Sequence, residues 1–171
     1  MKPDPRTPVA FQPKRILVGT DFSVGARAAV EAAVDLAKAS GAELILAHVV
    51  PISAFVGFAG AGGALAFDAA QLQRAVHAES EQALRDEAAR IHALGVQVRT
   101  AILDGPAALE LCELAKGSAV ELVVVGSHGR TGIGRLLLGS VAENVVRHAP
   151  TAVLVIRQAP EASPSRSHQL S

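Results

Sequence analysis

The sequence predicts an α/β fold: a single-domain, Rossmann-like open parallel sheet of five strands, in the order 3-2-1-4-5, with helices on both faces. Two observations favour it. Short apolar runs alternate along the 171 residues with longer segments of helical periodicity, which is the pattern of strands joined by crossover helices. The apolar runs are continuous rather than alternating, as expected for parallel strands that are buried on both faces.

The strands are expected at five apolar runs, residues 15–20, 43–50, 96–103, 120–125 and 151–157. Each run is rich in Val, Ile or Leu, and Asp21 ends the first while Gly126 ends the fourth. We expect right-handed crossovers between neighbours, because parallel strands are almost always joined in that way.

The helices are expected between the strands, at residues 23–40, 68–94, 106–117 and 140–148. Gly41 and Gly95 follow the first two helices as C-terminal cap residues. Capping boxes at residues 68–71 and 140–143 open the second and the fourth helix. Pro106 begins the third, because proline is favoured in the first turn of a helix.

The folded domain is expected to span residues 14–157. A Pro-rich arm, residues 1–13, precedes it, and a Ser- and Pro-rich tail, residues 158–171, follows it; we expect both to be flexible. The arm lacks the apolar core that a signal peptide needs. Cys112 is the only cysteine, so it forms no internal disulfide and is expected to pack in the core. These features favour a cytoplasmic protein.

The composition argues against several classes of function. Sixteen Lys and Arg residues balance sixteen Asp and Glu residues, which leaves no basic excess for binding nucleic acid or an anionic membrane. Only 3% of the residues are aromatic, which argues against base stacking. The uncharged stretch 44–67 approaches the length of a membrane span, but Pro51 and several glycines interrupt it, so we expect a strand and an apolar loop. The six histidines lack the spacing of a zinc site.

Ligands of such sheets bind beyond the carboxyl ends of the strands where the strand order reverses, here after the first and fourth strands. The glycine-rich segment 126–138 follows the fourth strand and leads into the helix at Ser140. Its glycines would let backbone N–H groups wrap an anion, and the start of the helix favours a phosphate. Arg130 and Arg135 could supply opposing charge. The segment could also be only a tight connection, and neither a P-loop nor a GxGxxG motif is present.

Three separated segments resemble the universal stress protein family. The motif G-x2-G-x9-G-[S/T] of its nucleotide-binding branch is matched in full at Gly126, Gly129, Gly139 and Ser140. Residues 19–23, Gly-Thr-Asp-Phe-Ser, are similar to the family's segment after the first strand, and residues 48–49 are similar to the end of its second strand. The resemblance extends over residues 14–157.

The resemblance implies that the chain binds ATP. The charge of that ligand in turn implies a divalent cation, Mg²⁺ or Mn²⁺, held through the phosphates. Asp21 matches the family's acidic residue near the adenosine, and Val49 matches the position that meets adenine. Gly126 and Gly129 match the loop that passes the ribose and phosphates, and residues 139–140 match the phosphate-binding turn. The complete candidate set is Thr20, Asp21, Val49, Gly126, Ser127, His128, Gly129, Arg130, Gly139, Ser140 and Val141.

Other interpretations of these residues stay open. Asp21 could cap the first helix, and Ser140 could cap the last helix while also binding phosphate. The apolar loop after the second strand could fill the core or close as a lid over the adenine, through Phe55, Phe58 and Phe67.

The expected function is that of an ATP-binding stress-response protein whose nucleotide state sets its conformation or its partner. His128 lacks a positioned partner to act as a general base, so hydrolysis is expected to be slow. Two alternatives stay open: a nucleotide-independent dimeric scaffold, against which the intact glycines argue, and a cyclic-AMP-binding member of the same family. An adenylating enzyme would need an SGG-x-DS-like loop that the sequence lacks. Strand 151–157 would lie at the sheet edge, and the resemblance implies a homodimer through it.

Overall fold

The computed structural model describes residues 11–50, 63–128 and 138–157. They form a five-stranded, all-parallel sheet in the order β3-β2-β1-β4-β5, which confirms the predicted fold and strand order. The strands are β1 (Arg15–Gly19), β2 (Glu43–Val50), β3 (Val98–Asp104), β4 (Leu122–Gly126) and β5 (Ala152–Ile156).

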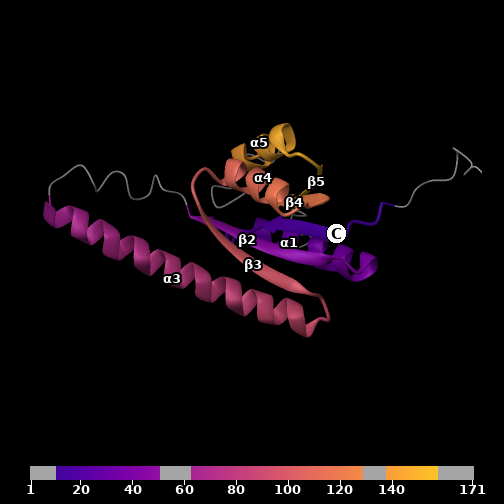
Figure 1. Cartoon of the computed structure of the whole chain (residues 1–171), viewed down its shortest axis with the longest axis horizontal. Helices are drawn as coiled ribbons and strands as arrows, with labels where there is room; N and C mark the ends of the chain where they lie inside the picture. Colours follow the sequence, from indigo (N-terminus) through magenta and orange to yellow (C-terminus); the bar gives the residue numbers. More distant parts are fainter. Residues whose placement is uncertain (1–10, 51–62, 129–137, 158–171) are drawn as a thin grey trace, which may run out of the picture.

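Helices cover both faces of this sheet (Figure 1). They are α1 (Val24–Ser40), α3 (Gly63–Ala93), α4 (Ala107–Gly117) and α5 (Ser140–His148). Alternate strand residues point to opposite faces, so β1 divides its side chains between two cores. Ile16 and Val18 pack with α1 and α3, whereas Leu17 packs with α4 and α5. The helix that follows β1 and the helix that follows β4 therefore leave the sheet on opposite sides.

The start of α3 corrects one prediction. The helix begins at Gly63, five residues before Asp68, so the predicted capping box does not open it. The intervening residues 64–67, Ala-Leu-Ala-Phe, contain neither proline nor glycine, and good helix formers let the helix continue past an internal aspartate. Phe67 therefore belongs to α3 rather than to a loop, while Phe55 and Phe58 lie outside the described residues.

The start of α5 corrects a second prediction. The N-cap is Gly139 and not Ser140, so the N-terminus of this helix has no hydrogen bond from an N-cap side chain. The Gly139 amide donates to the Ser127 carbonyl at 2.8 Å, and a Cβ at residue 139 would lie 3.2 Å from that oxygen. This close approach fixes residue 139 as the entry to the helix, so Ser140 becomes its first residue.

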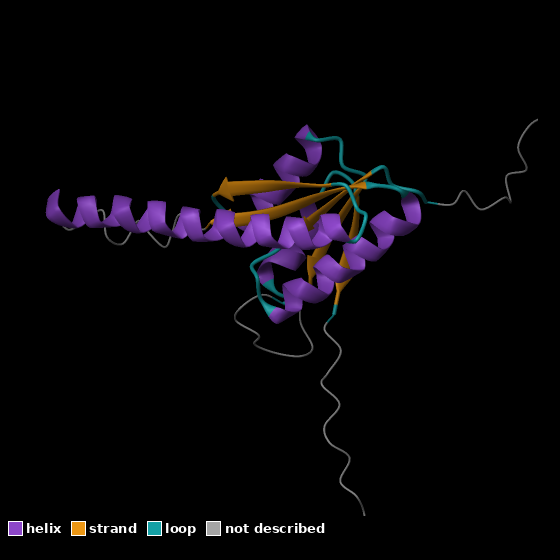
Figure 2. Ribbon diagram, turned by 90° about the horizontal axis from the view of Figure 1, so that it is seen from below, coloured by secondary structure: helices purple, strands orange, loops and turns teal. Residues whose placement is uncertain are grey.

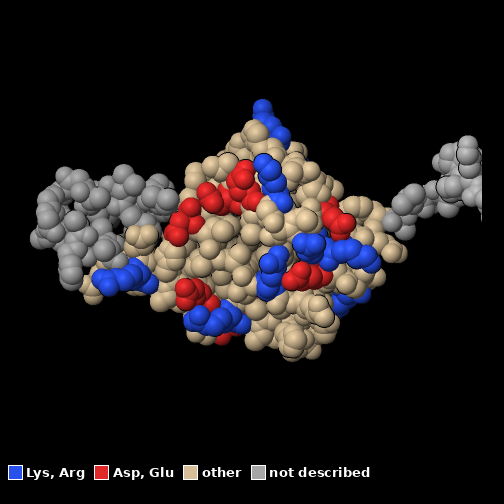
Figure 3. All heavy atoms as spheres, viewed as in Figure 1, with Lys and Arg blue, Asp and Glu red and all other residues tan. Residues whose placement is uncertain are grey.

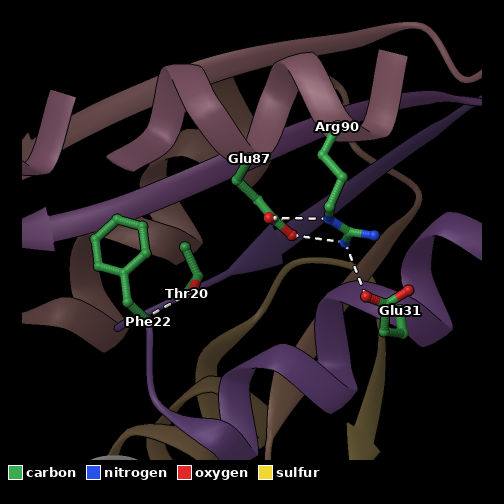
Figure 4. A network of polar contacts seen from close by, with 5 residues as sticks. All are labelled: Thr20, Phe22, Glu31, Glu87 and Arg90. Atoms are coloured by element: carbon green, nitrogen blue, oxygen red, sulfur yellow. Dashed lines mark hydrogen bonds and ion pairs between the residues drawn. The ribbon is translucent and has the colours of Figure 1, made fainter. Parts of the chain in front are cut away.

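Helix α3 extends past the end of the sheet in both views (Figures 1 and 2). Between residues 71 and 93 its buried apolar side chains are Leu84 and Ile91. On the same helix Arg90 pairs with Glu87 at 2.7 Å and reaches Glu31 of α1 at 2.8 Å (Figure 4). These three side chains are partly exposed, so the pairs contribute at most about 1 kcal/mol each to stability. Leu84 and Ile91 therefore hold this part of α3 on the sheet.

Acidic and basic side chains are intermixed on the face shown in Figure 3, in line with the balanced composition. Over the described part of the chain, no helix combines the length and the apolar character needed to cross a membrane.

Candidate functional site

A cavity of about 240 Å³ opens at the carboxyl ends of β1, β2 and β4. It lies where the strand order reverses, between the first turns of α1 and α5, which is the place predicted for a ligand. Helix α4 closes one side through Ala107 and Leu111. Five separate segments of the sequence therefore meet around one space, residues 19–26, 47–49, 107–111, 125–128 and 139–142.

Nine of the eleven candidate residues line this cavity: Thr20, Asp21, Val49, Gly126, Ser127, His128, Gly139, Ser140 and Val141. The other two, Gly129 and Arg130, lie outside the described residues, as does Arg135. Sequence reasoning missed the apolar remainder of the lining, which is Gly19, Ala26, Ala47, Ala107, Leu111, Val125 and Ala142. Gly19 and Ala142 lie within motifs that the sequence showed but were not chosen as site residues, and the other five belong to no motif. Strand periodicity could have indicated Ala47, because it shares a strand face with Val49.

The turn from β1 into α1 brings Thr20 and Asp21 to the cavity wall. Asp21 Oδ1 accepts a hydrogen bond from the Ser23 amide at 3.0 Å, and Ser23 Oγ accepts one from the Ala26 amide at 3.2 Å. Ser23 is therefore the N-cap of α1, and the alternative role of Asp21 as the cap is not the one observed. Asp21 stabilises the turn before the helix and leaves its carboxylate at the cavity.

Gly25 and Gly126 let the first turn of α1 pass the end of β4 with the two backbones in direct contact. A Cβ at Gly126 would lie 2.9 Å from the carbonyl oxygen of Gly25, and a Cβ at Gly25 would lie 2.7 Å from the carbonyl oxygen of His128. Real Cβ atoms essentially never come so close, so neither position accepts a side chain without a backbone shift. The fold thus requires a glycine at residue 126 whether or not a ligand binds.

The first turn of α5 faces the cavity through Ser140 and Val141, which are both exposed. The first amide groups of a helix have no partner within it, and the helix dipole places a partial positive charge there. Because the N-cap is a glycine, its position carries no side chain that could occupy these amides. The helix start is therefore suited to an anion.

Ser127 and His128 form the polar floor of the site. The side chain of Ser127 is buried, with 4% of the residue exposed, and its Oγ lies 3.1 Å from His128 Nδ1. The prediction that His128 lacks a positioned partner is therefore wrong: its neighbour in the sequence is the partner. Among the described lining residues Asp21 is the only carboxylate, and none is a lysine or arginine.

Cys112 is buried on α4, next to the lining residue Leu111. Burial, and to a smaller extent the negative charge of Glu113, raise the pKa of its thiol. A neutral, buried thiol is a core residue rather than a nucleophile.

Comparisons with known proteins agree with this arrangement. A model of the Universal stress protein family matches residues 13–157. Universal stress protein MJ0531 of Methanocaldococcus jannaschii is 34% identical over 145 residues, which cover 85% of this chain and 82% of that protein. The structure of universal stress protein UspA from Lactobacillus plantarum is similar with a TM-score of 0.74 and 31% identity, over 84% of this chain and 97% of that one. The crystal structure of a universal stress protein in complex with cAMP gives a TM-score of 0.62 and 30% identity, over 86% and 98% of the two chains.

Proposed function

This chain belongs to the universal stress protein family, and from that premise we propose that it binds an adenine nucleotide in the cavity between β1, β2 and β4. The proposed ligand is ATP, with Mg²⁺ or Mn²⁺ carried on its phosphates. One observation supports this most strongly: an apolar wall, a carboxylate and the start of a helix converge on one cavity.

These three features correspond to the three parts of the ligand. Ala47 and Val49 offer apolar surface to the adenine ring. The Asp21 carboxylate can accept hydrogen bonds from ribose hydroxyls or from the adenine amino group. The first turn of α5, at Ser140 and Val141, offers backbone donors and a partial positive charge to the phosphates.

The divalent cation would be held mainly by phosphate oxygens and water, because Mg²⁺ dehydrates reluctantly. Within the described residues no three His, Cys, Asp or Glu side chains are grouped as a metal site, so the protein would take up the cation together with the nucleotide. There it would neutralise phosphate charge. We expect slow hydrolysis, because the Asp21 carboxylate is bonded to the turn and His128 Nδ1 lies against the Ser127 hydroxyl.

We propose that the bound nucleotide sets the conformation of the protein, or its choice of protein partner, in a stress response. The nucleotide would contact the ends of β1 and β4 and the first turn of α5 together, so its phosphates would couple the position of α5 to the central strands. A ligand that prefers one arrangement of these segments shifts the population towards it.

Ser140→Asp is expected to abolish measurable ATP binding, with a loss of affinity of about 100-fold or more, because it places a negative charge where the phosphates would lie. The fold should tolerate the change, since residue 140 is exposed and an acidic residue in the first turn favours a helix. Calorimetric titration of the nucleotide-free protein with ATP and Mg²⁺ measures it.

The matched control is Leu109→Asp. It adds the same negative charge in the first turn of α4, at an exposed residue that does not line the cavity. It should bind ATP as the unmodified chain does. Absence of binding in the unmodified, folded chain would contradict the proposal and favour the nucleotide-independent scaffold. Equal binding by Ser140→Asp would place the phosphates elsewhere.

Cyclic AMP is a second candidate ligand, because one similar structure, at 30% identity, is that of a universal stress protein in complex with cAMP. The adenine and ribose contacts would be shared, whereas the phosphate contacts differ. The same titration with cyclic AMP and ADP separates the candidates: a preference for cyclic AMP over ATP would assign this chain to the second.

We also propose a homodimer through residues 151–157. Among the residues that the structure describes, strand β5 is at the sheet edge and pairs with β4 alone, and residues 153–156 are apolar and half-buried. A second copy could pair with this open edge about a two-fold axis.

Val155→Lys is expected to convert the dimer to a monomer, because it introduces a charge into the covered edge. Val155→Thr, which keeps the branched shape, should remain dimeric. Sedimentation equilibrium at micromolar concentration measures both, and a monomeric unmodified chain would contradict the dimer.

A further inference from the structure

The turn between β1 and α1 has an unusual backbone conformation at Phe22. Its φ angle is 62°, in the left-handed region that bulky residues rarely adopt. Such a conformation persists only where the surroundings hold it, and it often occurs beside functional sites. Phe22 directly follows Asp21, so whatever holds Phe22 also fixes the direction of the Asp21 side chain.

The strand next to β1 supplies one of these restraints through His48. This side chain is buried, with 6% of the residue exposed, and its Nδ1 lies 2.8 Å from the carbonyl oxygen of Thr20. A carbonyl oxygen only accepts hydrogen bonds, so the imidazole carries a proton on Nδ1 and donates it. The contact joins β2 to the first residue of the turn.

The ring and the amide of Phe22 provide further restraints on the same turn. Its ring lies against the His48 ring with 4.7 Å between the centroids and 36° between the planes. Its amide donates to Thr20 Oγ1 at 3.0 Å (Figure 4). Thr20 therefore receives hydrogen bonds at both its carbonyl and its hydroxyl oxygen, from two residues whose rings pack together.

His48 itself does not line the cavity, although both of its neighbours in β2 do. Ala47 and Val49 point to the face covered by α4 and α5, and strand alternation directs His48 to the face covered by α1 and α3. The imidazole thus lies on the face of the sheet opposite the cavity, and it affects the site through its hydrogen bond to the backbone of Thr20.

We propose that His48 is a positioning residue for nucleotide binding: its hydrogen bond to Thr20, with the Phe22 ring packed on it, holds the left-handed turn that directs Asp21 at the cavity. This inference rests on the proposed function, because it concerns the same site. It assigns a role to a residue that touches neither the ligand nor the cavity.

The test compares His48→Leu with His48→Asn in ATP titrations. Leucine fills much of the volume but cannot donate to Thr20, so we expect affinity to fall by about tenfold or more. The amide nitrogen of asparagine reaches nearly the same position as Nδ1, so His48→Asn should bind within about threefold of the unmodified chain. His92→Leu, at an exposed residue near the end of α3, controls for the loss of an imidazole.

A second measurement reports on the turn without nucleotide. In ¹⁵N-labelled protein, hydrogen exchange at the Phe22 amide should become faster in His48→Leu and stay unchanged in His48→Asn, because only the first releases the turn. A structural role elsewhere in the core would leave this amide unchanged in both.

The outcomes separate the two proposals. If the unmodified chain binds no nucleotide, the proposed function fails and the role of His48 falls with it. If the unmodified chain binds ATP and His48→Leu binds equally well, only the role of His48 is overturned. Loss of affinity in His48→Leu with rescue by His48→Asn, and faster exchange at Phe22 in the first alone, supports it.

Discussion

Gly126→Ala is expected to lower the free energy of unfolding by about 3 kcal/mol, because the added methyl group meets backbone rather than side chain. Its Cβ would lie 2.9 Å from the carbonyl oxygen and 3.1 Å from the carbonyl carbon of Gly25. Backbone atoms in the first turn of α1 cannot rotate away as a side chain can, so the helix must move from the end of β4. Urea denaturation followed by circular dichroism measures the loss.

Gly19→Ala is the matched control, since Gly19 ends β1 as Gly126 ends β4 and both line the cavity. Its Cβ would lie 3.0 Å from Leu111 Cδ1, the flexible tip of a side chain. We expect a loss of about 1 kcal/mol or less, because the leucine can adopt another rotamer. Equal losses at the two glycines would mean that the crossing of α1 over β4 is not the tight contact described above.

Gly126 is required by the fold and also lines the cavity. A glycine substitution at residue 126 that abolished nucleotide binding would report on the fold as much as on the ligand, because the same residue permits the crossing. Ser140→Asp avoids the difficulty, since residue 140 is exposed and its backbone remains helical. Mutations at the α5 side of the cavity are therefore the more direct test of binding.

The sheet order and the location of the site could be predicted from the sequence because they depend on repeated, local signals. Continuous apolar runs mark buried parallel strands, and the topology of such sheets directs ligands to the point where the order reverses. Helix starts were less predictable. Asp68 and Ser140 both have the residue types of an N-cap, yet Gly63 and Gly139 precede them at the actual starts. At residue 139 a tertiary contact with the Ser127 carbonyl decides the start.

The support of the β1–α1 turn could not be predicted at all. A phenylalanine gives no local signal for a left-handed conformation, which is typical of glycine and asparagine. The conformation at Phe22 depends on packing against His48, 26 positions later in the chain, and on a hydrogen bond from that imidazole to Thr20. Only the three-dimensional pairing of β1 with β2 brings these residues together.

Ile91→Ala is expected to lower the free energy of unfolding by about 3 kcal/mol, through lost burial and the cavity that remains. Ile91 is fully buried in the core cluster with α1 and the central strands, and between residues 71 and 93 it is one of two buried apolar side chains of α3. Alanine has the higher helix propensity, but by only about 0.4 kcal/mol, so the packing loss decides the sign. Thermal and urea denaturation both measure it.

Leu72→Ala provides the comparison within the same helix, because Leu72 is 45% exposed on the part of α3 that is N-terminal to both buried side chains. Leu72→Ala should change the free energy of unfolding by no more than about 0.5 kcal/mol. If the ion pairs of Arg90 held α3 instead, Ile91→Ala would lower the free energy of unfolding only slightly. High salt would then destabilise the protein strongly, because salt screens exposed ion pairs. Because those pairs are partly exposed and Ile91 is not, we expect the stability of the unmodified chain to depend little on salt.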